Sequence, residues 1–330
     1  MRKSLIIGLL LLCSSTLVSK QDDSILEHLQ YRLNRVAKAA DSLTLSANQG
    51  VRLQTAQWLN DSLEEILSFE ESFILKFDSF KTVSIQSSED ERVRLFTWNY
   101  FNDTGFYTVF GILQLNPQYY DEFLYPLEPS KTAVDTSFQT LSPDQWIPAL
   151  YYGIYTYKYK RKCYYILTGY HGATPYLDQR IVEVLYIDKK EGPQFGKPIF
   201  FEKNAFSRPK SRLIFNYASE ASMVCRVEKD EKILVISHLV PVRWQKKGNF
   251  EYYTPDGSYD FYQYRKGVWK YSDHLNDFNK KIEQVNEKDH GMGWDIFLAS
   301  LSLLDDHLSI VDDVEACDKK STHHIDHSEF

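Results

Sequence analysis

The strongest constraint on the fold is a change in hydrophobic period near residue 82 of this 330-residue chain. From there to residue 272, apolar and polar residues alternate in short runs, a pattern typical of β-strands. Short turn sequences such as Asn102-Asp-Thr-Gly105 separate these runs. Strands joined by such short turns pair antiparallel, because a parallel crossover needs about a dozen residues or more. Strands are expected at residues 92–99, 106–115, 150–159, 163–170, 180–187, 197–202, 212–217, 222–228, 233–239, 259–264 and 268–272.

The segments on either side of this region have helical periodicity. In residues 20–80, apolar residues recur at steps of three and four, as at Ile25, Leu29 and Leu33. A capping box at Ser62-Leu-Glu-Glu65 indicates that a helix restarts there. Residues 273–315 have a similar helical pattern, and residues 316–330 form a polar tail. The sequence predicts an α+β fold: an N-terminal helical hairpin packed on a large antiparallel β-meander, sandwich or partly open barrel over residues 81–272, with a C-terminal helical extension.

The first nineteen residues have the three parts of a secretory signal peptide. Arg2 and Lys3 form a basic start, residues 5–12 are apolar, and small residues offer cleavage near Ser19. A lipid anchor at Cys13 is the alternative, since the preceding leucines resemble a bacterial lipobox. No later segment reaches the roughly 20 apolar residues that a membrane span needs, so no transmembrane helix is expected after signal removal. The sequence predicts export to the periplasm or cell envelope.

Composition narrows the function classes. The formal net charge is −7 and no long basic run occurs, which argues against nucleic-acid binding. A content of 23 Tyr, 20 Phe and 6 Trp is typical of β-rich exported proteins. The cysteines at Cys163 and Cys225 could form a disulfide, and the sequence leaves this pairing open. Neither a Gly-x-Ser-x-Gly elbow, a His-Glu-x-x-His helix, a Cys-x-x-Cys pair nor a glycine-rich phosphate loop occurs, so no cofactor is expected.

Residues 252–271 raise the question of a calcium site. Asp256, Ser258 and Asp260 alternate as the first ligands of a calcium loop do. The Pro255-Asp-Gly257 sequence is also a strong turn signal, and the glycine and glutamate positions of a calcium loop are not matched. We therefore expect a hairpin that bends at Pro255–Gly257.

The tyrosine-rich stretch at residues 151–170 is the main candidate for ligand binding. Tyr151, Tyr155, Tyr157 and Tyr159 are expected on one face of a strand, where their rings could stack sugars or hold an extended peptide. The same stripe could instead line a core. His171 is expected in a glycine-flanked turn between two strands, where functional side chains concentrate, although a surface histidine is the simpler interpretation.

Two other histidine positions complete the candidates. His238 ends an apolar strand and is expected to be structural. In the tail, His323 and His327 are four residues apart, so a helical turn would place both imidazoles on one face as in zinc helices. A weakly binding, unstructured His-rich tract is the alternative.

Several blocks of sequence resemble a known family. They are LTGYHGATPYLDQRIVEVLYI, FGKPIF, RLIFNYASEASMVCRVE, SHLVP and TPDGSYDFYQYRKGVWKY, within residues 90–272. The chain is similar here to a family of exported proteins from Bacteroidota-type Gram-negative bacteria that has no assigned activity. Many members have Trp-Asp-Gly where this chain has Tyr170-His-Gly172. The resemblance implies an exported, β-rich protein and supplies no active site.

The sequence thus predicts an exported cell-envelope protein that acts as a non-enzymatic binding or interaction module, with an envelope or extracellular partner. A hydrolase of envelope or extracellular polymers is the alternative, because a catalytic triad assembled from distant positions leaves no sequence motif. A deep pocket with converging Asp, Glu or His side chains would favour the hydrolase, and an aromatic-lined surface would favour binding.

Overall fold

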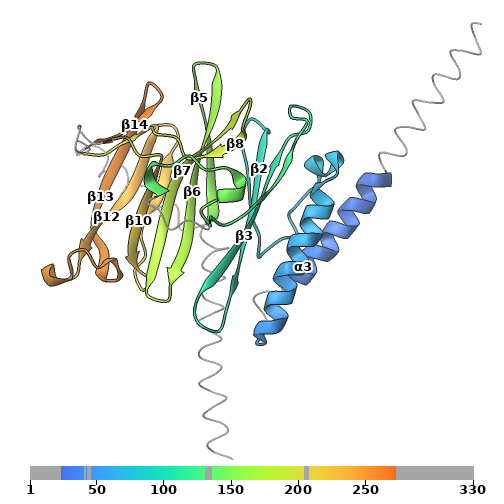
Figure 1. Cartoon of the computed structure of the whole chain (residues 1–330), viewed down its shortest axis with the longest axis horizontal. Helices are drawn as coiled ribbons and strands as arrows, with labels where there is room; N and C mark the ends of the chain where they lie inside the picture. The colour runs from blue at the N-terminus through green and yellow to red at the C-terminus, as the bar shows by residue number, and fades with distance from the viewer. Residues whose placement is uncertain (1–23, 41, 43–45, 131–135, 204–207, 273–330) are drawn as a thin grey trace, which may run out of the picture. The chain divides into compact units, whose positions relative to one another are not determined.

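The computed structural model describes residues 24–272, apart from residue 41 and residues 43–45, 131–135 and 204–207. In this part of the chain, two helices precede a long series of strands (Figure 1). The predicted signal peptide with Cys13, the predicted helical extension at 273–315 and the tail with His323 and His327 lie outside the described residues. No helix of the described part has an apolar stretch long enough to cross a bilayer.

The two helices cover residues 24–40 and Gln49–Leu67, the second being α3. The Asn48 side chain caps α3 by accepting a hydrogen bond from the backbone N–H of Val51 at 3.2 Å. The predicted restart at Ser62–Glu65 is wrong, because α3 is continuous there. Leu59 and Leu63 are both fully buried, so one apolar stripe runs through the segment and packing stabilises a single helix.

The first sheet contains four strands in the order of the sequence. They are β1 (Ser84–Ser87), β2 (Val93–Phe101), β3 (Tyr107–Leu115) and β4 (Leu124–Leu127). All neighbours in this sheet are antiparallel. The sequence pattern predicts β2 and β3 but misses the two edge strands, which are only four residues long. Pro126 made the β4 segment look irregular, and proline is tolerated there because β4 is an edge strand.

The second sheet has the order β10-β7-β6-β5, with β8 also paired to β7. Its strands are β5 (Leu150–Tyr159), β6 (Lys162–Thr174), β7 (Leu177–Asp188), β8 (Gly192–Phe195) and β10 (Arg212–Ala218). Each lies close to a strand predicted from the alternating pattern, except the short β8.

The third sheet has the order β11-β12-β13-β14-β9. Its strands are β9 (Phe200–Phe201), β11 (Cys225–Glu228), β12 (Ile233–Pro241), β13 (Tyr253–Arg265) and β14 (Val268–Ser272). Only the β14–β9 contact is parallel. All three sheets of the described residues have open edges, so none closes into a barrel, and the predicted antiparallel α+β architecture is confirmed in this form.

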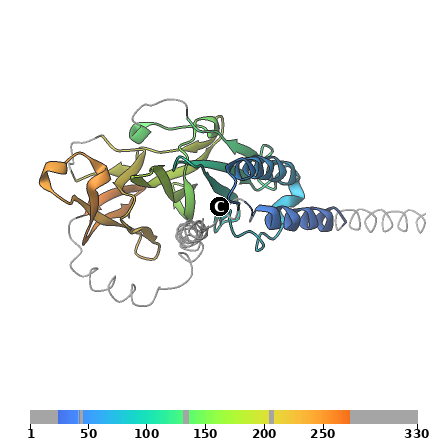
Figure 2. The same cartoon turned by 90° about the horizontal axis from the view of Figure 1, so that it is seen from below.

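Three hydrophobic cores hold these elements together. The helices share a core with one face of the first sheet, and the second sheet packs against the first on one side and the third on the other. In both views the N-terminal helices and the third sheet lie on opposite sides of the second sheet (Figures 1 and 2). Leu167 faces one core and Ile166 the other, which explains why β6 and β7 have continuous buried runs rather than alternation.

A buried ion pair ties the second sheet to the segment before β5. The guanidinium of Arg212 donates to Glu183 Oε2 at 2.9 Å, and both side chains are fully buried. Arg212 also donates to the backbone carbonyls of Thr136, Gln139 and Phe195. The second carboxylate oxygen of Glu183 accepts the Tyr151 hydroxyl at 2.5 Å. Every charge of the pair therefore has a hydrogen-bond partner.

The Pro255-Asp-Gly257 segment is a bulge and not the turn of a hairpin. β13 runs without a break from Tyr253 to Arg265, and its pairing with β12 shifts register opposite His238. The local turn chemistry is as expected, because Asp256 accepts from the Ser258 backbone N–H at 2.9 Å and Gly257 has a φ of +91°. Because the flanking residues still pair with β12, the extra residues bend one strand instead of ending it.

The two described cysteines do not form a disulfide. Cys163 and Cys225 are both free, and they contribute to different hydrophobic cores. Burial raises the pKa of the Cys225 thiol to about 11, so this thiol stays protonated near neutral pH.

Candidate functional site

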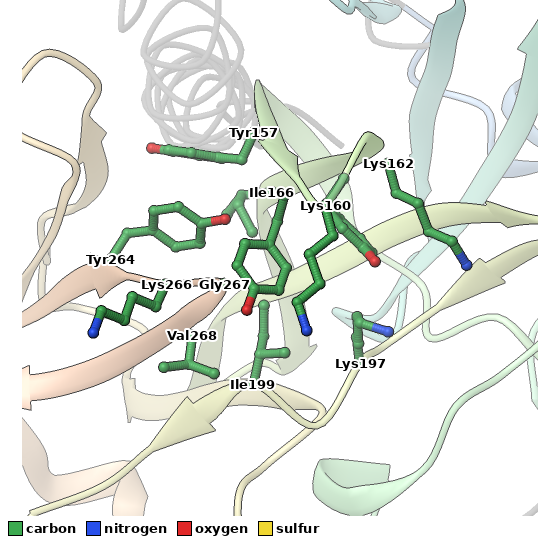
Figure 3. A pocket seen from close by; sticks show the side chains of 12 residues that line it. Tyr157, Lys160, Lys162, Ile166, Lys197, Ile199, Tyr264, Lys266, Gly267 and Val268 are labelled. Atoms are coloured by element: carbon green, nitrogen blue, oxygen red, sulfur yellow. The ribbon is translucent and has the colours of Figure 1, made fainter.

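Two hairpin tips line a common cleft. The β5–β6 turn consists of Lys160 and Arg161, with φ values of +47° and +64°, and the β13–β14 turn consists of Lys266 and Gly267, with φ values of +50° and +86°. Both are two-residue turns with left-handed central residues, the geometry that matches strand twist. Figure 3 shows the side chains that line the cleft. Its volume is about 430 Å³. We call it the tyrosine–lysine cleft; it is lined by Tyr157, Tyr159, Lys160, Lys162, Tyr164, Ile166, Lys197, Ile199, Tyr264, Lys266, Gly267 and Val268.

Strand pairing brings the tyrosines of the first tip together. Tyr157 lies directly opposite Tyr164 in the β5–β6 pair, and Tyr159 lies opposite Lys162. The Tyr159 ring packs directly against Gly267 of the second tip. A side chain at this position would clash, because its Cβ atom would lie 2.6 Å from Tyr159 Cδ1. The glycine therefore serves both the left-handed turn and the close approach of the two tips.

Packed aromatic rings form one side of the cleft. The ring of Tyr157 lies 4.9 Å from that of Tyr264 and 5.4 Å from that of Trp269, measured between centroids. Burial raises the pKa of the Tyr157, Tyr164 and Tyr264 hydroxyls above the usual value of 10.0. These hydroxyls therefore stay protonated and can donate hydrogen bonds, while the rings offer flat apolar faces to a ligand.

Four lysines give the cleft a positive charge. The Lys197 ammonium lies 5.2 Å from the Tyr164 ring centroid, and the Lys160 ammonium lies 5.4 Å from that of Tyr159. None of the four lysines forms an ion pair with a described residue. Figure 3 shows the Lys160 ammonium pointing among the labelled side chains, whereas Lys162 and Lys266 extend to opposite sides.

Lys197 is affected by a second cation of the cleft. Burial lowers the pKa of its ammonium, and the positive charge of Lys162 lowers it further, against a smaller opposite effect of Asp188. Within the described residues, the lining of the cleft includes no aspartate, glutamate or histidine. A negatively charged ligand would therefore meet cations that form no ion pair with a described residue, and no carboxylate in the described lining.

The basic residues occupy strained turn positions. Lys160, Arg161 and Lys266 all have positive φ, which costs a non-glycine residue roughly 1 kcal/mol or more. Two-residue hairpins of this type favour Asn-Gly or Asp-Gly, so lysine and arginine are not chosen for turn stability. Glu91 and Lys232, which do not line the cleft, also have positive φ, so this geometry belongs to short turns in general and places the basic side chains at the two tips without marking a binding site by itself.

The structure separates the predicted tyrosine stripe. Tyr157 and Tyr159 line the cleft, but Tyr155 does not, because its ring lies over Gly153, where a Cβ atom would be 2.8 Å from Tyr155 Cε2. Tyr151 points to the opposite face, into the core shared with the first sheet. The single-face prediction is wrong for Tyr151 because a bulge between Tyr151 and Gly153 shifts the register.

His171 lies within β6 and not in a turn. It pairs with Gln179 of β7, because both strands continue beyond the glycines to a turn at Pro175 and Tyr176. Burial lowers the pKa of the imidazole. His171 is seven residues from Tyr164, or about 23 Å along the strand at about 3.3 Å per residue, so it lies away from the cleft.

His238 is held by a carboxylate outside the cleft. Its Nδ1 lies 2.8 Å from Asp260 Oδ2, and the Tyr271 hydroxyl donates to Asp260 Oδ1 at 2.6 Å. A carboxylate-held histidine could act as a base, but no serine, threonine or cysteine of the described residues is hydrogen-bonded to it. Asp256 bonds Ser258 instead, so the alternating oxygens of this segment have separate partners.

No cluster of three or more metal-type side chains occurs among residues 24–272 as far as they are described. The metal site predicted at His323 and His327 lies outside this part of the chain.

The sequence shows which turns are basic but not that they meet. Lys160, Lys162 and Lys266 belong to segments predicted as turns, while Lys197 and Tyr264 lie in predicted strands. The two tips are about 105 residues apart, and only the packing of the second sheet on the third brings them together. Both tips are basic turns beside tyrosines in the sequence, but nothing in the sequence indicates that the two tips lie together.

Comparison of the chain with protein-family models, with curated proteins and with solved structures finds no match. The resemblance to an exported family therefore stays a prediction, and the function has to be argued from the cleft.

Proposed function

We propose that this protein is an exported, non-enzymatic binding module, and that the tyrosine–lysine cleft takes an acidic saccharide. The observation that carries the proposal is a cleft of about 430 Å³ with four tyrosines and four lysines and no acidic group in its described lining. The chain as a whole has a net charge of −7, so this positive cleft does not follow from composition. A cleft of this size lies within the usual range for small-molecule sites.

An acidic saccharide fits both kinds of side chain. The apolar C–H face of a sugar ring can stack on Tyr159 or Tyr264, and its hydroxyls can accept from the protonated tyrosine hydroxyls. The carboxylate of the sugar can accept hydrogen bonds from Lys160 and Lys197, which have no competing ion pair with a described residue. A neutral sugar would leave the lysines without a partner.

The hydrolase alternative has less support. General acid–base hydrolysis of a glycoside needs a pair of carboxyl groups on either side of the bond, and the described lining offers none. The carboxylate-held His238 lies on β12, a strand that contributes no residue to the lining. Binding without chemistry is therefore the proposal that the residues support.

Calorimetric titration of the full chain tests the proposal. The probes are tetragalacturonate and its fully methyl-esterified form, which share the sugar rings and differ in charge. We expect binding of the acidic form and at least tenfold weaker binding of the ester. Lys160→Gln combined with Lys197→Gln should weaken tetragalacturonate binding at least tenfold, and Tyr159→Ala should weaken both probes.

Lys229→Gln is the matched control, because this exposed lysine pairs with Glu89 outside the cleft. It should leave the Kd unchanged. Equal affinity for the acidic and esterified probes, or an unchanged Kd in the double lysine variant, would overturn the proposal.

Export is tested separately by the mass of the protein recovered after expression in a Gram-negative host. We expect the mature chain to start near Lys20. A start at Cys13 with added acyl mass would show a lipid anchor instead, and an intact Met1 in the cytoplasm would contradict export.

A further inference from the structure

The loop between β12 and β13 carries the most exposed aromatic side chain of the described residues. Residues 242–252 project beyond the ends of both strands (Figures 1 and 2). Trp244 is 73 % exposed, and Val242, Phe250 and Tyr252 are also exposed. Large apolar side chains gathered on one projecting loop are typical of an interaction site.

The loop has a defined backbone, so its exposed side chains are held in place. The Val242 N–H donates to the Tyr252 carbonyl at 2.9 Å and closes the base of the loop. Two short 3₁₀ turns, Trp244–Lys246 and Phe250–Tyr252, form its body. The Gly248 N–H donates to the Tyr253 hydroxyl at 3.0 Å and joins them. Trp244 and Phe250 are therefore presented to solvent by ordered structure.

Cations lie beside these rings. The Lys246 ammonium is 3.9 Å from the Tyr252 ring centroid, and the Lys247 ammonium is 4.5 Å from that of Trp244. Arg243 adds a third positive charge, and Glu251 is the one acidic residue of this loop. None of the three cations forms an ion pair with a described residue.

We infer that residues 242–252 dock on the surface of an anionic lipid bilayer. Trp and Tyr prefer the level of the lipid headgroups, where their rings meet the acyl boundary and their polar atoms stay hydrated. Lysine and arginine beside them bind lipid phosphates and are attracted to an anionic leaflet. The loop offers both from one projecting tip. A protein partner is less favoured, because the centres of protein interfaces are depleted in lysine.

The lipid surface is independent of the proposed saccharide binding. The loop precedes β13 and the cleft lies beyond its far end, up to about 40 Å away at about 3.3 Å per residue. Docking at the loop would therefore leave the cleft open.

Vesicle co-sedimentation of the full chain tests this inference. The probes are vesicles of phosphatidylcholine alone and vesicles with about a third phosphatidylglycerol. We expect binding to the anionic vesicles that falls at least tenfold in Trp244→Ala combined with Phe250→Ala. Lys246→Gln combined with Lys247→Gln should remove the preference for anionic lipid.

Tyr176→Ala is the matched control, because Tyr176 is 69 % exposed at the β6–β7 turn and has no lysine neighbours in sequence. It should bind as the unchanged protein does. A second readout is quenching of Trp244 fluorescence by brominated lipids, taken as the difference between the unchanged protein and Trp244→Phe.

Equal vesicle binding of the loop variant and the unchanged protein, or no quenching of Trp244, would overturn the inference. Self-association in sedimentation velocity that is lost in Trp244→Ala, without vesicle binding, would show that the loop joins two copies of the chain instead.

Discussion

Arg212 and the lysines of the cleft are cations of one protein in opposite surroundings. Arg212 is fully buried, pairs with Glu183 and donates to three backbone carbonyls. Lys160 and Lys197 have aromatic rings as neighbours and no ion pair with a described residue. A cation whose hydrogen-bond donors all have protein partners cannot bind a ligand, and it contributes to stability. A cation without such partners contributes little to stability and is available for binding. The comparison assigns Arg212 to the fold and the lysines to the site.

The largest effect is expected from breaking the buried pair. Arg212→Met leaves the carboxylate of Glu183 buried without its cation and removes the anchors of Thr136 and Gln139. We expect a loss of about 3–5 kcal/mol in the free energy of unfolding, measured by urea denaturation. Lys210→Met is the control, because its pair with Glu202 is partly exposed and should contribute below about 1 kcal/mol.

If Arg212→Met does not fold, Glu183→Gln gives the same information, since it removes the charge and keeps the shape. A loss no larger than that of Lys210→Met in both variants would contradict the assignment of Arg212 to stability.

Asp178 is a mostly buried carboxylate, intermediate in burial between the Arg212–Glu183 pair and the lysines of the cleft. Burial raises its pKa to about 6, against the opposing effects of the Tyr170 hydroxyl and Arg180. A group whose pKa is raised on folding stabilises the fold below its unfolded pKa of 3.8, and that contribution is lost as the pH rises through about 6. We expect the free energy of unfolding to fall by about 1–2 kcal/mol between pH 4 and pH 6.5 from this group.

Asp178→Asn should flatten this part of the pH profile, measured by urea denaturation at several pH values. Asp256→Asn is the control, because its carboxylate is exposed and the Ser258 hydrogen bonds lower its pKa. An unchanged slope in Asp178→Asn would show that Asp178 is ionised in the fold at pH 4.

The smallest effect on stability is expected at Lys197. Folding lowers the pKa of its ammonium, so the charged form is disfavoured in the folded state, and stability rises as the pH increases through the lowered pKa towards 10.5, the usual value. Lys197→Met should change the free energy of unfolding at pH 7 by less than about 0.5 kcal/mol, while it weakens the binding of an acidic ligand. A clear loss of stability in Lys197→Met would mean that Lys197, like Arg212, stabilises the fold.

The regular strands could be predicted because the alternation of apolar and polar residues can be recognised within a single short segment. The runs at 150–159 and 268–272 coincide with β5 and β14. The missed strands, β1 and β4, are short and depend on pairing with β2 and β3 rather than on their own pattern. The Ser62–Glu65 capping box failed because burial of Leu63 with Leu59 outweighs a local start signal.

The alternation of apolar and polar residues does not predict the direction of side chains beyond a β-bulge, because the bulge shifts them to the other face of the strand. One extra residue at Tyr152 puts Tyr151 in a different core from Tyr157, although both have odd numbers. A similar irregularity turned the predicted hairpin at Pro255–Gly257 into a bend of β13. The cleft itself needs contact between two distant tips, and a single sequence carries no signal of that contact. Two of the predicted ligand-binding residues, Tyr157 and Tyr159, nevertheless line it.

The short outer strands have a consequence for the behaviour of the protein at high concentration. The first sheet ends in β1 and β4, four residues each, and the third ends in β11, of four residues, and β9, of two. An extended segment of another molecule could form only a few backbone hydrogen bonds along any of these edges, too few to hold it. The second sheet has the longer edge strands: β5, which is interrupted by its bulge at Tyr152, and β10, which has seven residues. Among residues 24–272 as described, β10 is thus the one uninterrupted edge of more than four residues on which amyloid-like association could start.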